Sequence, residues 1–356
     1  MSFSNLLRSA LRSVFWTIVV LGLVSALVAW ALWNRYQQFL ATPLELDSEE
    51  IIIDVPRGTT MRALGQRLRE DRIFDNPYWF LALAYQRGQL NALKAGEYAV
   101  TSGTLPEELL DQLVTGRSIE LPITFIEGWT YRDAIQAIAK RSSFVSELSE
   151  LSDEAIAERL QIPQGHPEGW FFPDTYRFPR GSTDVTILTR AYERMRAVLD
   201  QEWADRAPDL PVTTPYEALI LASIIEKETG VASERPAISG VFTRRLREGM
   251  RLQTDPTVIY GMGEDYDGNI RKSDLTTPTP YNTYVIDGLP PTPIALPGRA
   301  AIHAAVHPED GEALYFVARG DGSHHFSATL EQHNCAVRHY QLGRPCGQLE
   351  PQPPAQ

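Results

Sequence analysis

LILASIIEKETG, the stretch Leu219–Gly230, decides how this chain folds. It holds seven uncharged residues in a row, and Glu226, Lys227 and Glu228 follow them without a turn signal. Pro215 after a threonine is typical of a helix start, so we predict a helix from there to the glycine. A helix that is apolar on every side is normally part of a core. The chain therefore places a carboxylate at the end of a core helix.

Two glutamates end this helix, and they differ in direction. Helix geometry turns Glu228 about 200° away from Glu226, so the two cannot pair on one face. Burial and the negative end of the helix dipole would both raise the pKa of Glu226, as a general acid requires. The alternative is a structural Glu226 paired with a buried arginine, for which the candidates are Arg244, Arg245 and Arg251. We expect Glu226 to be the acid and Glu228 to be a bystander.

The N-terminal part of the chain is apolar enough to cross a membrane. Residues 13–34 contain no charged side chain, and at 1.5 Å per residue they span the roughly 30 Å of a bilayer core. The alternative, a cleaved signal peptide, is disfavoured because the run is too long and no small-x-small cleavage site follows it. Arginines precede the span and acidic residues follow it, which places residues 1–12 in the cytoplasm. The rest would lie on the periplasmic face of a bacterial inner membrane.

Beyond the span, a strand, a Gly-Thr turn and a helix recur in short succession. This pattern resembles the LysM family of glycan-binding modules, and a plain α/β spacer is an equal alternative. We predict a LysM-like module in residues 48–120, a connecting region in 121–165, a catalytic domain in 166–340 and a disordered tail in 341–356. The predicted fold class is α+β: a single N-terminal transmembrane helix, a small LysM-like α/β module and a mixed α+β catalytic domain.

Composition and missing motifs exclude several classes of function. The net charge of −12, with no basic stripe, argues against a nucleic-acid partner. No Gly-x-Ser-x-Gly, Walker or Rossmann motif occurs, which argues against a serine hydrolase, an NTPase and a dehydrogenase. His303 and His307 lack the intervening glutamate of HExxH, so we predict no metal and no cofactor. Cys335 and Cys346 could form a disulfide in an oxidising compartment, which the sequence alone leaves open.

The C-terminal part carries polar and aromatic side chains in proline-stiffened loops. Gln253 and Asp255 stand in RLQTDP, and Asn282 and Tyr284 stand in TPYNTY. Carbohydrate sites use such rings and amides, although on composition alone these loops are equally consistent with structural turns. Glu168 is followed by three aromatic residues and is either a functional carboxylate or a turn cap.

Six segments carry a resemblance across most of residues 48–340. In chain order they are EGWFFPDTY, ASIIEKETGVASERP, GMRLQTDPTVIYGMG, TPYNTY, GLPPTPIALPG and HFSATLEQHN. Together they resemble the MltG (YceG-like) endolytic lytic transglycosylases. The resemblance implies a membrane-anchored lyase that cleaves nascent peptidoglycan between N-acetylmuramic acid and N-acetylglucosamine and so terminates glycan elongation. It also implies that the first glutamate of EKET, Glu226, is catalytic. The candidates for substrate binding are Glu168, Gln253, Asp255, Asn282, Tyr284, His324 and His333.

The implied chemistry needs one carboxylate. Glu226 would protonate the departing glycosidic oxygen and then accept the proton of the muramic 6-hydroxyl, which closes a 1,6-anhydro ring. A peptidoglycan hydrolase, the alternative chemistry, needs a second carboxylate roughly 5 to 9.5 Å away, which Glu168 or Asp255 could supply. Two non-enzymatic alternatives are a glycan-binding membrane tether and a scaffold for cell-wall synthases. The expected partners are therefore peptidoglycan strands and the inner membrane, with synthases as a further candidate.

Overall fold

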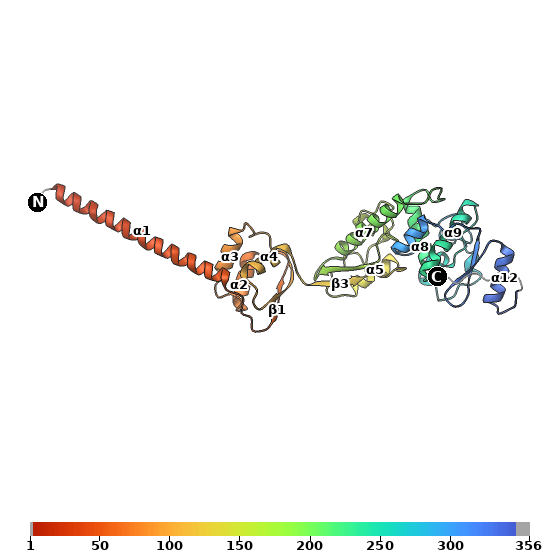
Figure 1. The fold of residues 1–356 in the computed structure, drawn as a ribbon, viewed down its shortest axis with the longest axis horizontal. Coiled ribbons are helices and arrows are strands. Elements are labelled where there is room, and N and C mark those ends of the chain that lie inside the picture. The colour runs from red at the N-terminus through yellow and green to blue at the C-terminus, as the bar shows by residue number, and fades with distance from the viewer. Residues whose placement is uncertain (1–2, 347–356) are drawn as a thin grey trace. The chain divides into compact units, whose positions relative to one another are not determined.

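The computed structural model of this chain describes residues 3–346, in two compact units that meet between Leu121 and Pro122 (Figure 1). The first unit holds one long helix and a small module, and the second holds the segment LILASIIEKETG. Most of the predicted tail, residues 347–356, lies outside the described residues. The mixed α+β composition agrees with the prediction.

Helix α1 (Phe3–Ala41) opens the first unit. Its segment Phe15–Ala41 has 27 residues and high mean hydropathy, and an 18-residue stretch within it is not buried, so its length and composition are compatible with a membrane span. The predicted span of residues 13–34 falls within α1. The helix continues beyond that span, however, to Ala41.

The module that follows α1 has a β-α-α-β-α order. It consists of β1 (Glu50–Val55), α2 (Met61–Glu70), α3 (Pro77–Gln86), β2 (Gly96–Thr101) and α4 (Pro106–Thr115). The two strands pair antiparallel, with Ile53 opposite Tyr98. Thr60 caps α2 by accepting a hydrogen bond from Ala63 N, as the predicted Gly-Thr turn implies. Sequence analysis did not identify α3.

The end of α1 belongs to the core of this module. Tyr36 and Leu44 are buried in the same apolar cluster as Phe80 and Leu109, and Phe39 packs against it. The hydroxyl of Tyr36 donates to Gln86 Oε1 at 2.6 Å. The last turns of α1 are therefore held by the packing of the module.

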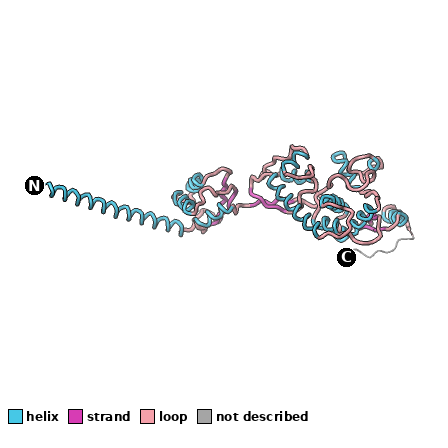
Figure 2. The backbone as a smooth tube through the Cα atoms, turned by 90° about the horizontal axis from the view of Figure 1, so that it is seen from above, coloured by secondary structure: helices cyan, strands magenta, loops and turns pink. Residues whose placement is uncertain are grey.

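The second unit is built around α8 (Pro215–Glu228), which packs against α7 (Asp184–Ala204), α9 (Arg235–Arg247) and α11 (Arg299–Val306). Long loops connect these elements (Figure 2). The strands of this unit are β3 (Glu120–Thr124), which begins just before the boundary, β4 (Thr175–Pro179), β5 (Tyr315–Ala318) and β6 (His324–Ser327). Its other helices are α5 (Tyr131–Ala139), α6 (Asp153–Arg159), α10 (Asp255–Met262) and α12 (Leu330–Tyr340). Short 3-10 turns occur at Ala232–Glu234, Gly263–Asp265 and Asp274–Thr276. Strands β3 and β4 form one pair and β5 and β6 another.

Helix α8 begins where the sequence predicts. Thr214 caps it by accepting from Glu217 N, Pro215 is its first residue, and every side chain from Ala218 to Ile225 is buried. It ends at Glu228, and Thr229 already has extended backbone angles. The loop that contains Ile294 is tied to this helix, because Ser223 Oγ accepts a hydrogen bond from Ile294 N at 3.0 Å.

Candidate active site

A cavity of about 410 Å³ lies at the C-terminal end of α8. Glu228, the last residue of the helix, lines it. The cavity wall also contains residues from the loop before α10, from β5 and from α12. Five of the predicted substrate-binding residues lie here, namely Gln253, Asp255, Tyr284, His324 and His333. Glu228 thus shares one cavity with residues that lie up to about a hundred positions later in the sequence.

The surroundings of Glu228 raise the pKa of its carboxyl group. Thr254 Oγ1 donates a hydrogen bond to its Oε1. Burial raises the pKa of Glu228 to about 7; the Thr254 hydrogen bond opposes the rise, and the nearby charge of Asp255 adds to it. A carboxyl with a pKa near 7 is protonated in a large fraction of molecules at neutral pH, as a proton donor must be.

The loop that faces Glu228 is held by a second segment of the chain. Gln253 N donates to Thr283 O at 3.1 Å, and Thr254 N donates to Thr283 Oγ1 at 3.0 Å. Tyr284 OH donates to Asp255 Oδ1 at 2.6 Å. Gln253 has a φ of 51°, a left-handed conformation that is uncommon for a residue other than glycine and is often found at functional sites. These bonds fix the polar loop predicted from RLQTDP beside the acid.

A buried cation and an aromatic ring complete this wall. Arg245 Nε donates to Leu314 O at 2.6 Å, and its Nη1 donates to Leu252 O at 2.8 Å. Its guanidinium lies 5.0 Å from the ring centre of Tyr315, which also lines the cavity. Arg245 was considered as an ion-pair partner of Glu226, but it faces the cavity of Glu228 instead.

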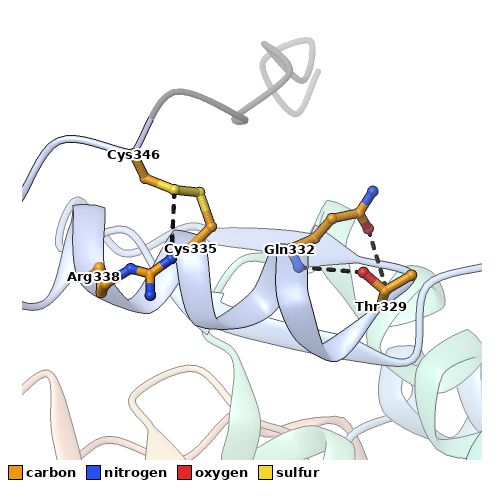
Figure 3. The surroundings of a disulfide bond; sticks show 5 residues. All are labelled: Thr329, Gln332, Cys335, Arg338 and Cys346. Atoms are coloured by element: carbon orange, nitrogen blue, oxygen red, sulfur yellow. Dashed lines mark hydrogen bonds between the residues drawn. A yellow bond between two sulfur atoms is a disulfide. The ribbon is translucent and has the colours of Figure 1, made fainter.

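Two histidines reach the cavity from the C-terminal elements. The backbone N of His324 donates to Glu234 Oε1 at 2.7 Å, and its Nδ1 lies 2.8 Å from Glu234 Oε2, so Glu234 fixes the imidazole ring. His333 stacks on Tyr315, with the ring centres 5.3 Å apart, and burial lowers the pKa of His333. His333 lies on α12, which a disulfide between Cys335 and Cys346 joins to the following loop (Figure 3).

Glu226 lies in different surroundings. Arg235 Nη2 donates to its Oε1 at 3.1 Å, and Gly298 N donates to its Oε2 at 2.9 Å. Burial raises the pKa of Glu226, while both hydrogen bonds oppose the rise. The side chain is 5% exposed and does not line the cavity of Glu228. The contact is an ion pair of the kind predicted as the alternative, with Arg235 in place of Arg244, Arg245 and Arg251.

Two predicted substrate-binding residues also lie away from the cavity. Glu168 is fully buried, and its carboxyl group accepts hydrogen bonds from Tyr131 N, Gly169 N and Tyr260 OH at 3.0 to 3.2 Å. Asn282 is buried and holds its own loop, since its side-chain amide donates to the backbone at two positions. Both side chains are therefore engaged in hydrogen bonds within the protein, and neither lines the cavity of Glu228.

Of the residues that line this cavity, Thr254 and Tyr315 are not among the predicted site residues, and Glu228 was predicted to be a bystander. Thr254 stands between two predicted residues, and Arg245 was predicted only as an ion-pair partner. The position of Glu228 at the last residue of the helix was the available signal, because a helix end is where a core element reaches a loop-lined surface.

One further cluster contains possible metal ligands. Glu202, His303 and His307 offer atoms within 4.8 Å of one another. Glu202 already accepts from Arg299 Nε at 2.7 Å and lies 2.8 Å from His303 Nδ1, and His307 Nε2 lies 2.7 Å from Asp205 O. The arginine supplies the positive charge that a cation would bring, so we describe this cluster as a hydrogen-bonded helix contact.

Comparisons with known proteins identify the family to which this chain belongs. A protein from Bacillus subtilis (strain 168) named endolytic murein transglycosylase is 30% identical over 323 residues, covering 86% of this chain and 89% of that protein. A protein of the same name from Streptococcus pneumoniae is 26% identical and is covered over 60% of its length. The crystal structure of a putative YceG-like protein from Listeria monocytogenes matches 80% of this chain with a TM-score of 0.50 and 27% identity. The model of the YceG-like family matches residues 53–339, and the chain belongs to this family.

Proposed function

We propose that this protein is an endolytic murein transglycosylase, a lyase that cuts peptidoglycan strands internally and leaves a 1,6-anhydro-N-acetylmuramic acid end. Two relatives that match 86% and 84% of this chain carry this name. The single observation that carries the proposal is the placement of Glu228, with a pKa of about 7, in a cavity lined by polar and aromatic side chains.

Glu228 is the proton donor in this proposal. Its protonated carboxyl gives a proton to the glycosidic oxygen as the bond to C1 of the muramic sugar breaks. Positive charge then develops at C1, and the resulting carboxylate accepts the proton of the 6-hydroxyl of the same sugar. That hydroxyl oxygen bonds to C1 and closes the anhydro ring, so no water is consumed. One carboxyl group therefore serves both steps.

The contacts of the two glutamates favour Glu228 over Glu226, which sequence analysis put forward. A general acid must reach the oxygen it protonates, and Glu228 lines a cavity large enough for sugar rings. Both carboxyl oxygens of Glu226 are engaged by Arg235 and Gly298. We infer that Glu226 supports the site by holding the loop at Gly298 against α8.

A hydrolase is the second candidate, and one observation favours it. Asp255 lines the same cavity as Glu228, so two carboxyl groups face one space. In an inverting glycosidase, the second carboxylate activates a water molecule. Here Asp255 accepts a hydrogen bond from Tyr284 OH at 2.6 Å, which occupies one of its two oxygens. Product analysis separates the two reactions.

The first unit gives the proposed enzyme its place in the cell. We propose that α1 anchors the chain in the bacterial inner membrane, with the N-terminus in the cytoplasm and the second unit in the periplasm. The antiparallel β-α-α-β arrangement of the module supports a LysM-like role in binding glycan. Cell-wall synthases are a further proposed partner, because nascent strands are made at this membrane.

The test is product analysis with matched variants. Purified full-length wild type, Glu228→Gln and Glu226→Gln are incubated with uncrosslinked glycan strands, and the products are identified by mass spectrometry. We expect internal fragments with anhydro ends from wild type, none from Glu228→Gln, and the same fragments from Glu226→Gln in proportion to its folded fraction by circular dichroism. Reducing ends only would establish the hydrolase. Normal turnover by Glu228→Gln, with loss in a folded Glu226→Gln, would return the acid role to Glu226.

A further inference from the structure

The outer face of α3 in the first unit has an unusual composition. The helix PYWFLALAYQ, Pro77–Gln86, contains no charged residue. Its two tyrosines, Tyr78 and Tyr85, are seven residues apart and therefore lie on one side of the helix, where they are 73% and 75% exposed. The exposed side of α2 in the same module carries arginines and a glutamate instead. Leu81 and Ala82 lie between the two tyrosines on the same side of the helix and are half-buried, so this face is a continuous apolar stripe of the kind that marks contact with a protein or a membrane.

The position of α3 indicates what that partner is. Trp79 and Gln86 contact Tyr36 of α1: the rings of Tyr36 and Trp79 lie 6.0 Å apart, and Tyr36 OH donates to Gln86. Tyr36 in turn lies 6.1 Å from the ring of Trp33, at the end of the apolar run. A continuous row of aromatic rings thus leads from the candidate membrane span to α3. Figure 1 shows α3 on the side of the module that α1 enters, and β1 on the side away from it.

The lengths place this contact at the edge of a bilayer. The segment Phe15–Ala41 is 27 residues long, which at 1.5 Å per residue is about 40 Å, the thickness of a bilayer with its polar layers. Tyr36 is three residues beyond Trp33, or about 5 Å along the axis, and each polar layer is roughly 5 to 8 Å thick. A helix packed on Tyr36 therefore lies within or against the polar layer.

The first charged side chain after α3 is turned away from this face. Arg87 forms ion pairs of 2.8 Å with both Glu107 and Asp111 on α4. Its charge is neutralised within the module, so it does not oppose contact between α3 and lipid. Tyrosine suits such a contact because its ring is apolar and its hydroxyl remains at the level of the headgroups.

We propose that α3 is a membrane-surface helix, which inserts Tyr78 and Tyr85 into the lipid headgroup layer on the periplasmic side. This inference rests on the proposed membrane anchor. Because the end of α1 is part of the core of the module, the anchor and α3 form one support with two contacts to the bilayer. The module is then held at a fixed orientation on the membrane.

The test measures the depth of single spin labels in a bilayer. The two native cysteines are joined, so single cysteines can be added to the full-length chain and labelled without reductant. Tyr78→Cys and Tyr85→Cys report on α3, and Leu23→Cys reports on the span. Ile52→Cys on β1 is the matched control, because Ile52 is an exposed apolar residue of the same module, at 61%. The protein is placed in nanodiscs of phosphatidylethanolamine and phosphatidylglycerol.

The measured quantity is the ratio of label accessibility to oxygen, which enters lipid, and to a water-soluble nickel chelate. We expect this ratio to be several-fold higher at positions 78 and 85 than at 52, and highest at 23. A label at 23 deep in lipid with labels at 78 and 85 as aqueous as that at 52 would overturn the surface helix and leave the anchor intact. Aqueous labels at all four positions would overturn both. Labels at 78 and 85 that stay aqueous until glycan strands are added would assign this face to glycan instead.

Discussion

The hydroxyl of Thr254 donates a hydrogen bond to Oε1 of Glu228, and this contact ties the loop before α10 to the last residue of α8. A hydrogen bond to a carboxylate stabilises the charged form and lowers its pKa. Burial acts in the opposite direction and is the larger effect, which leaves the pKa of Glu228 at about 7. The two effects together leave an acid that exchanges its proton near neutral pH.

The first prediction concerns the pH dependence of catalysis. Glu228 must be protonated to act as the acid, so we expect kcat/KM to fall above pH 7 and to approach a tenfold loss per pH unit. Initial rates on glycan strands between pH 5 and 9 measure this limb. His324 also lines the cavity, so His324→Asn is the control. The limb should persist in that variant, and its disappearance would mean that the limb does not report on Glu228.

The second prediction uses Thr254. Thr254→Val removes the hydroxyl and keeps the shape, so the carboxylate of Glu228 loses a hydrogen bond and its pKa rises. Hydrogen bonds to charged groups contribute about 1.5 to 3 kcal/mol, so we expect the alkaline limb to move up by about one to two pH units. Thr257→Val is the matched control, because the buried Thr257 bonds to Thr254 O and to Thr283 but not to Glu228. Equal shifts in the two variants would count against a specific role of the Thr254 hydroxyl.

Much of α8 could be predicted from its own residues, and its role could not. Pro215 and the apolar run determine the start and burial of the helix, and both are confirmed. Helix geometry also shows that Glu226 and Glu228 diverge. It does not show which side meets a cavity, because every side chain from Ala218 to Ile225 is buried. That outcome depends on segments far away in the sequence, such as the loop at Gly298, which binds Glu226.

The same limit applies to the first unit. The turns before α2 and α4 contain Gly and Thr at the spacing that predicts them, whereas α3 has no such glycine and was missed. Its cap is Asn76, whose side chain accepts from Tyr78 N. The burial of Tyr36 in the module could not be predicted either, because the sequence of an apolar helix does not show whether lipid or protein covers its end.

The third prediction concerns stability and Glu168. Burial raises the pKa of Glu168 to about 8, against about 4.3 in an unfolded chain. The folded protein therefore keeps a proton that the unfolded chain has lost, and the stability from this group is full below about pH 4 and declines as pH rises toward 8. We expect Glu168→Gln, which cannot ionise, to reduce this decline by about 1 to 4 kcal/mol between pH 5 and 8.

Urea denaturation of the full-length chain at several pH values measures this effect. Glu331→Gln is the control, because Glu331 is exposed on α12 and a substitution there should leave the pH dependence unchanged. Parallel stability curves for wild type and Glu168→Gln would show that Glu168 does not hold its proton in the folded state.

The last prediction concerns the disulfide. Cys335 is buried in the middle of α12, and Cys346 lies 11 positions later in the following loop. The bond therefore joins this loop to the helix that carries His333, which lines the cavity. A cross-link over so short a loop stabilises by roughly 2 to 3 kcal/mol. We expect Cys346→Ser to lower the free energy of unfolding by about that amount and to raise KM for glycan more than it lowers kcat, because α12 contributes to the wall while Glu228 stays on α8. Thermal unfolding and steady-state kinetics measure both, and wild type treated with reductant should behave like the variant. A loss of kcat at unchanged KM would instead mean that α12 positions a group needed in the transition state.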